Sequence, residues 1–344
     1  MTPLVAGPAA ASSPDAPSWR GPVAALQDRI LVIKLSALGD FIHALGPMAA
    51  IRRHHPGTHV TLLTTAPFRQ LAEKTGYFDA VWLDERAPLA RLDRWLPLVR
   101  HMRRARFTRI YDLQWADRTA WYFHLLGWPK PQWVGIVRGC SHRLREPSRR
   151  AHIRERHAEL LRLAGIAEVA PPDLSFLSAD ISRLGLAAPY ALLVPGSAPQ
   201  HRYKRWPVER FAAVAQAFTE RGLTPVLICG PAEREEAAAI ARACPAARDI
   251  EITYDEIVEL ARGASVAVSN DTGPSFFIAA AGCPLVVLYA GRNDPVKLAP
   301  PGDAVVTLQR DKLDQITVPD VLQAVDRIRR APDDAARPEQ KDLL

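Results

Sequence analysis

One stretch near the start of the chain limits the possible folds more than any other. Residues 30–35 read Ile-Leu-Val-Ile-Lys-Leu, a mainly apolar run with the length and branching typical of a buried parallel strand. Residues 36–39 break this run, and apolar residues with helical spacing follow from Asp40. Asp40 is therefore predicted at the carboxyl end of a central strand, the edge at which open α/β sheets bind ligands. An acid there also has a structural interpretation, because Asp stabilises helix starts.

The same alternation of strand and helix continues through the first half of the chain. Further strands are predicted at residues 59–64, 80–83 and 109–114, and helices at residues 66–74, 89–104, 118–126 and 151–164. Strands that alternate with helices at short spacing indicate a mainly parallel, doubly wound sheet.

A second series begins at residue 190. Its strands are predicted at residues 190–194, 224–229, 265–268 and 285–289, and its helices from Pro207, after Glu233, and at residues 254–262, 276–281 and 318–330. The fold class is therefore α/β, with two Rossmann-like domains at residues 28–180 and 181–330 that face a ligand-binding cleft. Residues 1–27, rich in Ala, Pro and Ser, are predicted to be a disordered tail, and residues 331–344 a charged tail.

Composition excludes several classes of protein. A hydrophobic content of 48% and a charged content of 24% are typical of soluble globular proteins, and no apolar stretch approaches the roughly 20 residues of a membrane span. The four cysteines lack short paired spacing, so no zinc or redox site is predicted and a reducing compartment fits. The net charge of +7 favours acidic partners. Residues 138–157, with seven arginines and two glutamates, form either a solvated surface or a site for a phosphorylated acceptor or anionic membrane.

Three turns after strands of the second series are predicted to share one edge of its sheet. They contain Gly196-Ser197, Gly-Pro-Ala-Glu at residues 230–233 and Asp-Thr-Gly-Pro at residues 271–274. A helix start at Gly273 offers backbone N–H groups to a phosphate, Lys204 offers a cation, and Glu233 accepts hydrogen bonds from a ribose. Each feature alone fits an ordinary turn, cap or solvated surface, but together they predict a nucleotide site. No Gly-x-Gly-x-x-Gly follows a strand and no Walker loop occurs, which disfavours dehydrogenases and P-loop enzymes.

Five motifs in order resemble glycosyltransferase family 9, the heptosyltransferases of the lipopolysaccharide inner core. They are Ser-Ala-Leu-Gly-Asp at residues 36–40, Tyr-Asp-Leu-Gln at 111–114, Lys-Arg-Trp-Pro at 204–207, Gly-Pro-Ala-Glu at 230–233 and Ser-Asn-Asp-Thr-Gly-Pro at 269–274. The resemblance spans roughly residues 28–330. It implies a GT-B fold, a nucleotide-diphosphate-sugar donor (typically ADP-heptose), inversion without a metal or cofactor, and a lipid-linked, phosphorylated glycan acceptor. It also implies a cytoplasmic protein, peripheral at the anionic inner face of the inner membrane.

The resemblance also assigns roles to individual residues. It implies that Asp40 is the general base, that Ser197 and Lys204 hold the diphosphate, and that Glu233 meets the ribose. Diphosphate and donor sugar would be held by Asp271, Thr272 and Gly273.

One departure from the family pattern leaves the donor open. The family usually continues with Met-His after Asp-Thr-Gly-Pro, whereas Phe276 occupies the histidine position here and cannot donate a hydrogen bond to a sugar. A nucleotide-sugar epimerase of the same fold and a non-catalytic sugar-nucleotide-binding protein are the alternatives. A nucleic-acid binder is disfavoured, because the arginines are not interleaved with aromatic residues on a known module.

Overall fold

The computed structural model describes residues 28–335 except 89, 146–150 and 292. The tail predicted at residues 1–27 and the last nine residues lie outside this part. The described chain divides between Phe176 and Leu177 into two compact units, here called the first and second unit. This division lies four residues before the boundary expected from the sequence.

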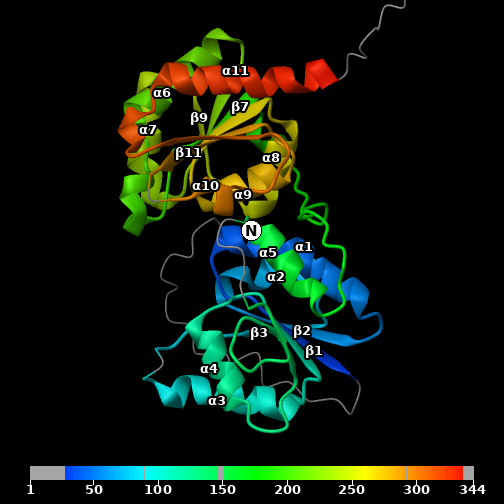
Figure 1. Cartoon of the computed structure of the whole chain (residues 1–344). Helices are drawn as coiled ribbons and strands as arrows, with labels where there is room; N and C mark the ends of the chain where they lie inside the picture. Colours follow the sequence, from blue (N-terminus) through cyan, green and yellow to red (C-terminus); the bar gives the residue numbers. More distant parts are fainter. Residues whose placement is uncertain (1–27, 89, 146–150, 292, 336–344) are drawn as a thin grey trace, which may run out of the picture. The chain divides into compact units, whose positions relative to one another are not determined.

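The first unit is a parallel six-stranded sheet in the order β3-β2-β1-β4-β5-β6. Helices α1, α2 and α5 lie on one face, and α3 and α4 on the other (Figure 1). The strands are β1 (Arg29–Ile33), β2 (His59–Thr64), β3 (Ala80–Leu83), β4 (Arg109–Asp112), β5 (Gln132–Gly135) and β6 (His142–Arg143). The helices are α1 (Leu38–His54), α2 (Arg69–Lys74), α3 (Leu92–Ala105), α4 (Asp117–Leu125) and α5 (Ile153–Arg162).

The second unit repeats this design with the sheet order β12-β11-β10-β7-β8-β9. Its strands are β7 (Tyr190–Val194), β8 (Thr224–Ile228), β9 (Arg248–Ile250), β10 (Val266–Asn270), β11 (Leu285–Ala290) and β12 (Val305–Arg310). Its helices are α6 (Val208–Glu220), α7 (Arg234–Ala243), α8 (Tyr254–Gly263), α9 (Gly273–Ala280), α10 (Pro295–Leu298) and α11 (Val318–Ala335). Counted from its own first strand, each sheet has the order 3-2-1-4-5-6 of a Rossmann fold. The predicted α/β class is confirmed, whereas the arrangement of the two units around a cleft stays a prediction.

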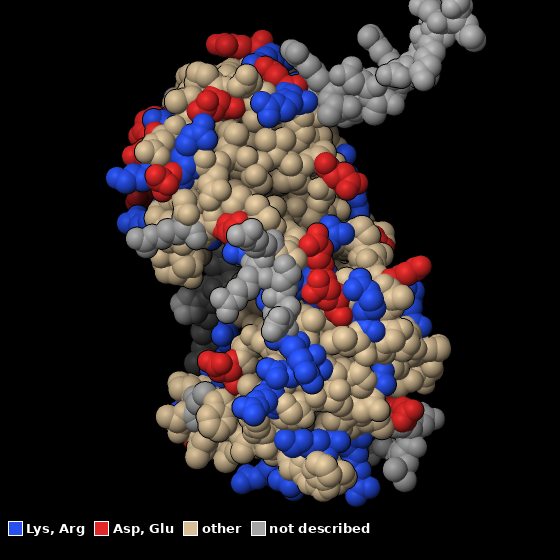
Figure 2. Space-filling model, in the orientation of Figure 1, with Lys and Arg blue, Asp and Glu red and all other residues tan. Residues whose placement is uncertain are grey.

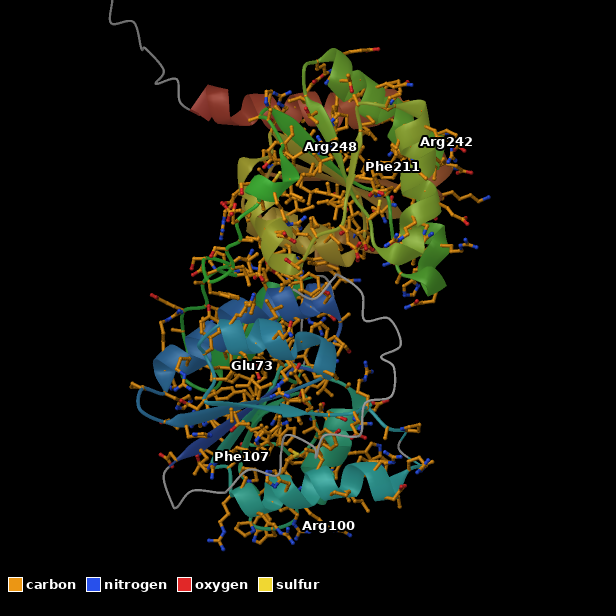
Figure 3. All side chains as sticks on the ribbon, turned by 180° about the vertical axis from the view of Figure 1, so that it is seen from behind. Glu73, Arg100, Phe107, Phe211, Arg242 and Arg248 are labelled. Atoms are coloured by element: carbon orange, nitrogen blue, oxygen red, sulfur yellow. The ribbon has the colours of Figure 1, made fainter. Side chains whose placement is uncertain are left out.

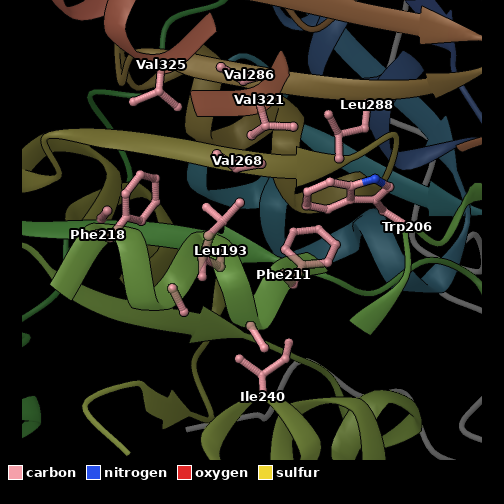
Figure 4. Close-up of a cluster of buried hydrophobic side chains, with 14 of the residues drawn as sticks. Leu193, Trp206, Phe211, Phe218, Ile240, Val268, Val286, Leu288, Val321 and Val325 are labelled. Carbon is pink, nitrogen blue, oxygen red and sulfur yellow. The ribbon is translucent and has the colours of Figure 1, made fainter. Parts of the chain in front are cut away.

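The core of the second unit fixes one of the predicted loops. Trp206, Phe211 and Phe218 are buried between α6 and the sheet, with Trp206 at the edge of this cluster (Figure 4). The indole Nε1 of Trp206 donates a hydrogen bond to the carbonyl of Ile316 at 2.9 Å. A buried aromatic side chain contributes about 2–3 kcal/mol through loss of water-exposed surface. Burial of Trp206 and its hydrogen bond to Ile316 therefore anchor the loop that carries Lys204, two residues earlier.

The sequence did not predict β5 and β6 of the first sheet or the outer strands β9 and β12 of the second, whereas the outer strand β3 was predicted. β6 has two residues, β9 exposes Arg248 and Asp249, and β12 is only partly buried. Such strands form because a neighbouring strand offers hydrogen bonds, and their residues show little periodicity of their own. β5 has only four residues and follows a Pro-rich turn, so its sequence also shows no clear strand pattern.

Two helix predictions need correction. The helix predicted at residues 66–74 is a 3₁₀ turn, Ala66–Phe68, followed by α2, because Pro67 lies in its first turn. Helix α11 continues to Ala335, so the first five residues of the predicted charged tail are helical.

Candidate active site

The predicted site residues lie at the point in each sheet where the strand order reverses. This point falls between β1 and β4 in the first unit and between β7 and β10 in the second. Connections leave in opposite directions there and open a crevice at the carboxyl ends of the strands. Asp40 follows β1, Ser197 follows β7, and Asp271 follows β10. Each unit therefore carries its candidate residues on the edge where open α/β sheets generally bind ligands.

Asp40 is the third residue of α1 and is partly exposed. Its Oδ2 accepts a 3.4 Å hydrogen bond from the backbone N–H of Ala37. The preceding turn is fixed by Gln114, whose Oε1 accepts hydrogen bonds from the backbone N–H groups of Leu35 at 2.8 Å and Ser36 at 3.1 Å. Gln114 follows β4, so the neighbouring strand holds the turn that presents Asp40. The sequence placed Gln114 in a family motif but gave it no role.

Ionisable groups are buried beneath this turn. Lys34 is 3% exposed, and its Nζ donates to the carbonyl of Leu113 at 3.2 Å. Burial lowers the pKa of Lys34, and the negative charges of Asp40 and Asp112 partly oppose this effect. Burial raises the pKa of Asp112 to about 6, although its carboxylate accepts three hydrogen bonds. The donors are the backbone N–H groups of Gln114 and Trp115 and the hydroxyl of Thr119.

Two buried histidines adjoin these groups. Burial lowers the pKa of His157 to about 3, and the positive charge of Lys34 adds to the effect. Burial, followed by the charge of His152, lowers the pKa of His43 to about 2. Both imidazoles are therefore neutral at physiological pH. His157 lies within the arginine-rich segment that the sequence left open as a surface or a site, so this part of it is core.

Two arginines, one exposed and one partly buried, lie at the same edge of the first unit. Arg86, after β3, is exposed, and its Nη1 donates to the hydroxyl of Ser36 at 3.1 Å, four residues before Asp40. Arg118 is more deeply placed, and its guanidinium donates to both carboxylate oxygens of Asp84 at 2.6 and 2.8 Å. The edge thus combines a partly exposed carboxylate with nearby guanidinium groups.

In the second unit, Lys204 and Asp271 form an ion pair beside the start of α9. The distance between Nζ and Oδ2 is 2.7 Å, and the side chains are 19% and 13% exposed. Asn293, after β11, donates its Nδ2 to the same Oδ2 at 2.5 Å. Thr272 occupies the N-cap of α9 and Gly273 its first turn, so helix N–H groups and an ammonium come together here. This combination favours a bound anion.

Asn270 connects the loops that form this edge. Its Nδ2 donates to the carbonyl of Pro195 at 2.6 Å, and its Oδ1 accepts from the backbone N–H of Trp206 at 3.1 Å. It thereby joins the end of β10 to the turn after β7 and to the loop of Lys204. The sequence placed Asn270 in a motif but did not predict this positioning role.

Arg205 organises the remaining predicted residues of this unit. Its guanidinium donates to the carboxylate of Glu233 at 3.2 Å and to that of Glu236. It also donates to the hydroxyl of Ser197 at 3.3 Å and to the Ser197 carbonyl at 2.8 Å. Arg205 was not predicted as a site residue. The paired acids Glu233 and Glu236, one helical turn apart, were the signal that could have found it.

Glu233 lies between two glycines. A Cβ placed on Gly196 would be 2.7 Å from Glu233 Cγ, and one on Gly230 would be 2.9 Å from its Oε2. The same Oε2 accepts a 3.0 Å hydrogen bond from the Gly230 N–H. Burial raises the pKa of Glu233, and the Arg205 charge opposes this. A side chain at either glycine would therefore displace this carboxylate from its present position.

Two further residues lie near the Ser-Asn-Asp-Thr-Gly-Pro motif at residues 269–274. Phe276 is buried within α9. The hydroxyl of Tyr289, near the end of β11, is buried and has no hydrogen-bond partner among the described residues. Burial and the charge of Asp271 raise the pKa of this phenol. A single hydroxyl in an otherwise apolar strand was the sequence signal for Tyr289. In the described parts of both units, no three His, Cys, Asp or Glu side chains gather to hold a metal ion.

Comparisons with known proteins agree with this architecture. Residues 95–319 match the family model of glycosyltransferase family 9 (heptosyltransferase). The lipopolysaccharide core heptosyltransferase OpsX of Haemophilus influenzae is 22% identical over 297 residues, which cover 79% of this chain and 81% of that protein.

Two solved structures share the fold. A family 9 glycosyltransferase from Veillonella parvula has a TM-score of 0.73 at 19% identity, covering 88% of this chain and 97% of that one. The heptosyltransferase WaaC of E. coli with ADP has a TM-score of 0.68 at 20% identity, covering 87% and 99%. The fold is the GT-B fold of these enzymes. The resemblance seen in the motifs is confirmed: the chain belongs to glycosyltransferase family 9 and is a glycosyltransferase that uses a nucleotide-sugar donor.

Proposed function

We propose that this enzyme transfers a sugar, typically heptose, from an ADP-sugar to a lipopolysaccharide-core-type acceptor, with inversion and without a metal ion. The observation that carries the proposal is the Lys204–Asp271 pair at 2.7 Å beside the start of α9. It supplies a cation and helix N–H groups where a diphosphate would bind. The family match and the heptosyltransferase relatives support the same reaction class.

The donor is held by the second unit. Lys204, Ser197 and the start of α9 at Thr272 and Gly273 bind the diphosphate. When the donor binds, Lys204 exchanges its partner Asp271 for a phosphate oxygen, and Asp271 becomes available to hydroxyl groups of the sugar. Glu233, placed by Arg205 and two glycines, accepts hydrogen bonds from the ribose.

The chemical step needs one base and one stabilised leaving group. Asp40 removes the proton from the acceptor hydroxyl while the oxygen of that hydroxyl forms a bond to the anomeric carbon of the donor sugar. The bond from that carbon to the diphosphate breaks on the opposite face, and the electron pair leaves with ADP. Lys204 and the N–H groups of α9 stabilise the charge that develops on the diphosphate. Base catalysis by a positioned carboxylate typically contributes about 10²–10⁴-fold.

Phe276 affects the choice of donor. Its buried ring takes the position of the family histidine, and the hydroxyl of Tyr289 lies close enough to Asp271 for their charges to interact. Tyr289 therefore offers a hydroxyl on the donor side where the ring of Phe276 offers none. A sugar other than heptose is the donor that this substitution would favour.

The acceptor is a lipid-linked, phosphorylated glycan, and the enzyme works at the cytoplasmic, anionic face of the inner membrane. The guanidinium of Arg86, which is bonded to Ser36 and exposed beside the turn of Asp40, supports an anionic acceptor.

A thermal-shift panel of nucleotides and nucleotide sugars tests the donor assignment. ADP and ADP-heptose should raise the melting temperature of the full chain, and uridine, guanosine and cytidine diphosphate sugars should not. Incubation of the stabilising donor with a lipopolysaccharide-core acceptor should then give a product of inverted anomeric configuration. Stabilisation by a nucleotide sugar with another base would refute ADP-heptose as the donor, whereas the fold assignment would still hold. Binding without transfer would favour the non-catalytic alternative.

A further inference from the structure

The outer layer of the first unit carries a basic surface that the proposed chemistry does not use. Residues 94–145 contain eleven Lys and Arg but two Asp, a net charge of +9, whereas the whole chain has +7. The basic excess of the protein is therefore concentrated in this segment, and the rest of the chain is slightly acidic. Lys and Arg side chains dominate the surface at the α3 end of this unit (Figure 2). None of the helices in the described part of the chain is both long and apolar enough to cross a membrane.

Helix α3 separates its apolar and basic side chains. Trp95, Leu98 and Met102 are buried against the sheet. Arg100, Arg103 and Arg104 are exposed, and Arg100 points away from the unit in Figure 3. No acidic residue occurs in the sequence between positions 94 and 111, so α3 supplies no carboxylate next to these guanidinium groups.

Two exposed tryptophans accompany these arginines. Trp128, in the turn after α4, is 89% exposed, and Trp121 on α4 is 49% exposed. The guanidinium of Arg103 lies against the same turn, because a Cβ on Gly127 would be 2.8 Å from its Nη2. Two residues after Trp128, the Nζ of Lys130 lies 3.8 Å from the ring centroid of Phe123. Large indoles are usually mostly buried, so two exposed ones within one basic surface indicate a binding surface.

We propose that this α3–α4 surface, made of Arg100, Arg103, Arg104, Trp121, Trp128 and Lys130, docks on an anionic lipid bilayer. Tryptophan is favoured at the boundary of headgroups and hydrocarbon, where its ring is partly apolar and its N–H stays hydrated. Each basic group near an anionic leaflet strengthens binding about fivefold. A solvated charged surface explains the arginines but leaves the indoles unexplained. The lipid interface explains both.

The position of this surface relates docking to the proposed reaction. Helices α3 and α4 both run from the edge of the sheet where Asp40 lies to the opposite edge, and Arg103, Arg104 and Trp128 lie toward that opposite edge. A bilayer along this layer would run parallel to the sheet, about 10 Å from it, the diameter of a helix. A lipid-linked acceptor would then have to extend along α4 to reach the edge of Asp40. That connection rests on the proposed function, whereas docking itself is measured without any substrate.

Co-sedimentation of the full chain with phosphatidylcholine vesicles, with and without phosphatidylglycerol, tests the proposal. The wild type should bind only the anionic vesicles. The double variant Trp121→Ala/Trp128→Ala should bind about tenfold more weakly or worse, and Arg100→Gln and Arg103→Gln about fivefold more weakly each. Matched controls on the second unit are Tyr203→Ala, an exposed aromatic residue, and Arg234→Gln, an exposed arginine, and both should bind like the wild type.

Three results would overturn the proposal. One is unchanged vesicle binding by the tryptophan double variant, because charge alone would then explain docking. Another is equal binding to neutral vesicles. The third is tighter binding to a single-stranded oligonucleotide through the same tryptophans. An unchanged melting temperature and an unchanged ADP-induced shift show that each variant is folded. A variant that loses docking but still binds ADP therefore identifies the docking surface. A variant that docks but no longer transfers sugar bears on the proposed function and leaves the docking proposal intact.

Discussion

The two units share one strand order but hold their charged groups in different ways. In the second unit the cations Lys204 and Arg205 are already paired with carboxylates, Asp271 at 2.7 Å and Glu233 at 3.2 Å. In the first unit Asp40 is held by the backbone N–H of Ala37, and no ion pair among the described residues includes it.

This difference fits two different tasks. A diphosphate site gains from cations that are fixed before the ligand binds, because little reorganisation is then needed as charge develops. A general base must keep its carboxylate available for a proton, and a close ion pair would weaken it as a base. The contrast therefore predicts that damage to the first unit impairs the chemical step and damage to the second impairs donor binding.

The largest effect is expected from Asp40→Asn, which removes the base but keeps the size of the side chain. The rate of transfer at saturating donor should fall about 10²–10⁴-fold. Asp117→Asn, an exposed acid at the start of α4 on the same sheet edge, is the matched control and should stay within about threefold of the wild type. Equal losses in both variants would mean that Asp40 acts only through general electrostatics.

Lys204→Ala should produce the next largest effect. Loss of one charge-assisted contact to the diphosphate should weaken ADP binding about 10–100-fold, as titration calorimetry would show. Arg202→Ala, an exposed cation in the same loop, should leave the affinity unchanged within about twofold. Similar losses in the two variants would indicate a diffuse basic surface in place of a specific site.

Arg205→Ala should reduce stability, because Glu233 and Glu236 would lose the cation between them. The free energy of unfolding should fall by about 2–3 kcal/mol in urea titrations. Arg205→Lys should recover only part of this, because an ammonium cannot reproduce the forked contacts to both acids and Ser197. Arg234→Ala, which breaks an exposed pair with Glu251, should cost less than about 1 kcal/mol. A similar cost in both variants would contradict an organising role for Arg205.

The smallest effect is a pH dependence of stability that arises in the first unit. The folded pKa values of His43 and His157, about 2 and 3, lie below their ordinary value, so their stabilisation is complete above pH about 6.5 and declines as the pH falls. The folded pKa of Asp112, about 6, lies above its ordinary value, so protonation stabilises the fold below about pH 6. Between pH 4 and 6, two histidines against one aspartate should leave the unfolded chain binding about one more proton, so stability should rise with pH by on the order of 1 kcal/mol per pH unit.

Urea titrations at several pH values test this slope. His157→Asn should abolish most of it, because one histidine then balances Asp112. Exposed His124→Asn should leave it unchanged. A slope that persists in His157→Asn would mean that other groups control the acid stability.

The sequence predicted the central strands of both sheets and the outer strand β3, but it missed β5, β6, β9 and β12. β1, β7 and β11 were predictable because they are buried on both faces, so nearly every residue is apolar. β6 and β9 carry exposed Arg143 and Arg248 and form through pairing with a neighbour, which no local pattern records.

The site shows the same limit. Asp40, Lys204 and Asp271 were predictable from turns that follow strands. The roles of Gln114, Arg205 and Asn270 were not, because each contacts residues at least 28 positions away in the chain. Such contacts depend on the order of the strands in the sheet, which periodicity alone does not specify.

Titration of ADP into the wild type, Asp40→Asn and Lys204→Ala tests most directly whether the first unit supplies the base and the second unit binds the donor. We expect Asp40→Asn to bind ADP as tightly as the wild type while transferring sugar far more slowly, and Lys204→Ala to bind ADP about 10–100-fold more weakly. Weakened ADP binding by Asp40→Asn, to the same extent as by Lys204→Ala, would contradict the assignment of the base to one unit and the donor to the other.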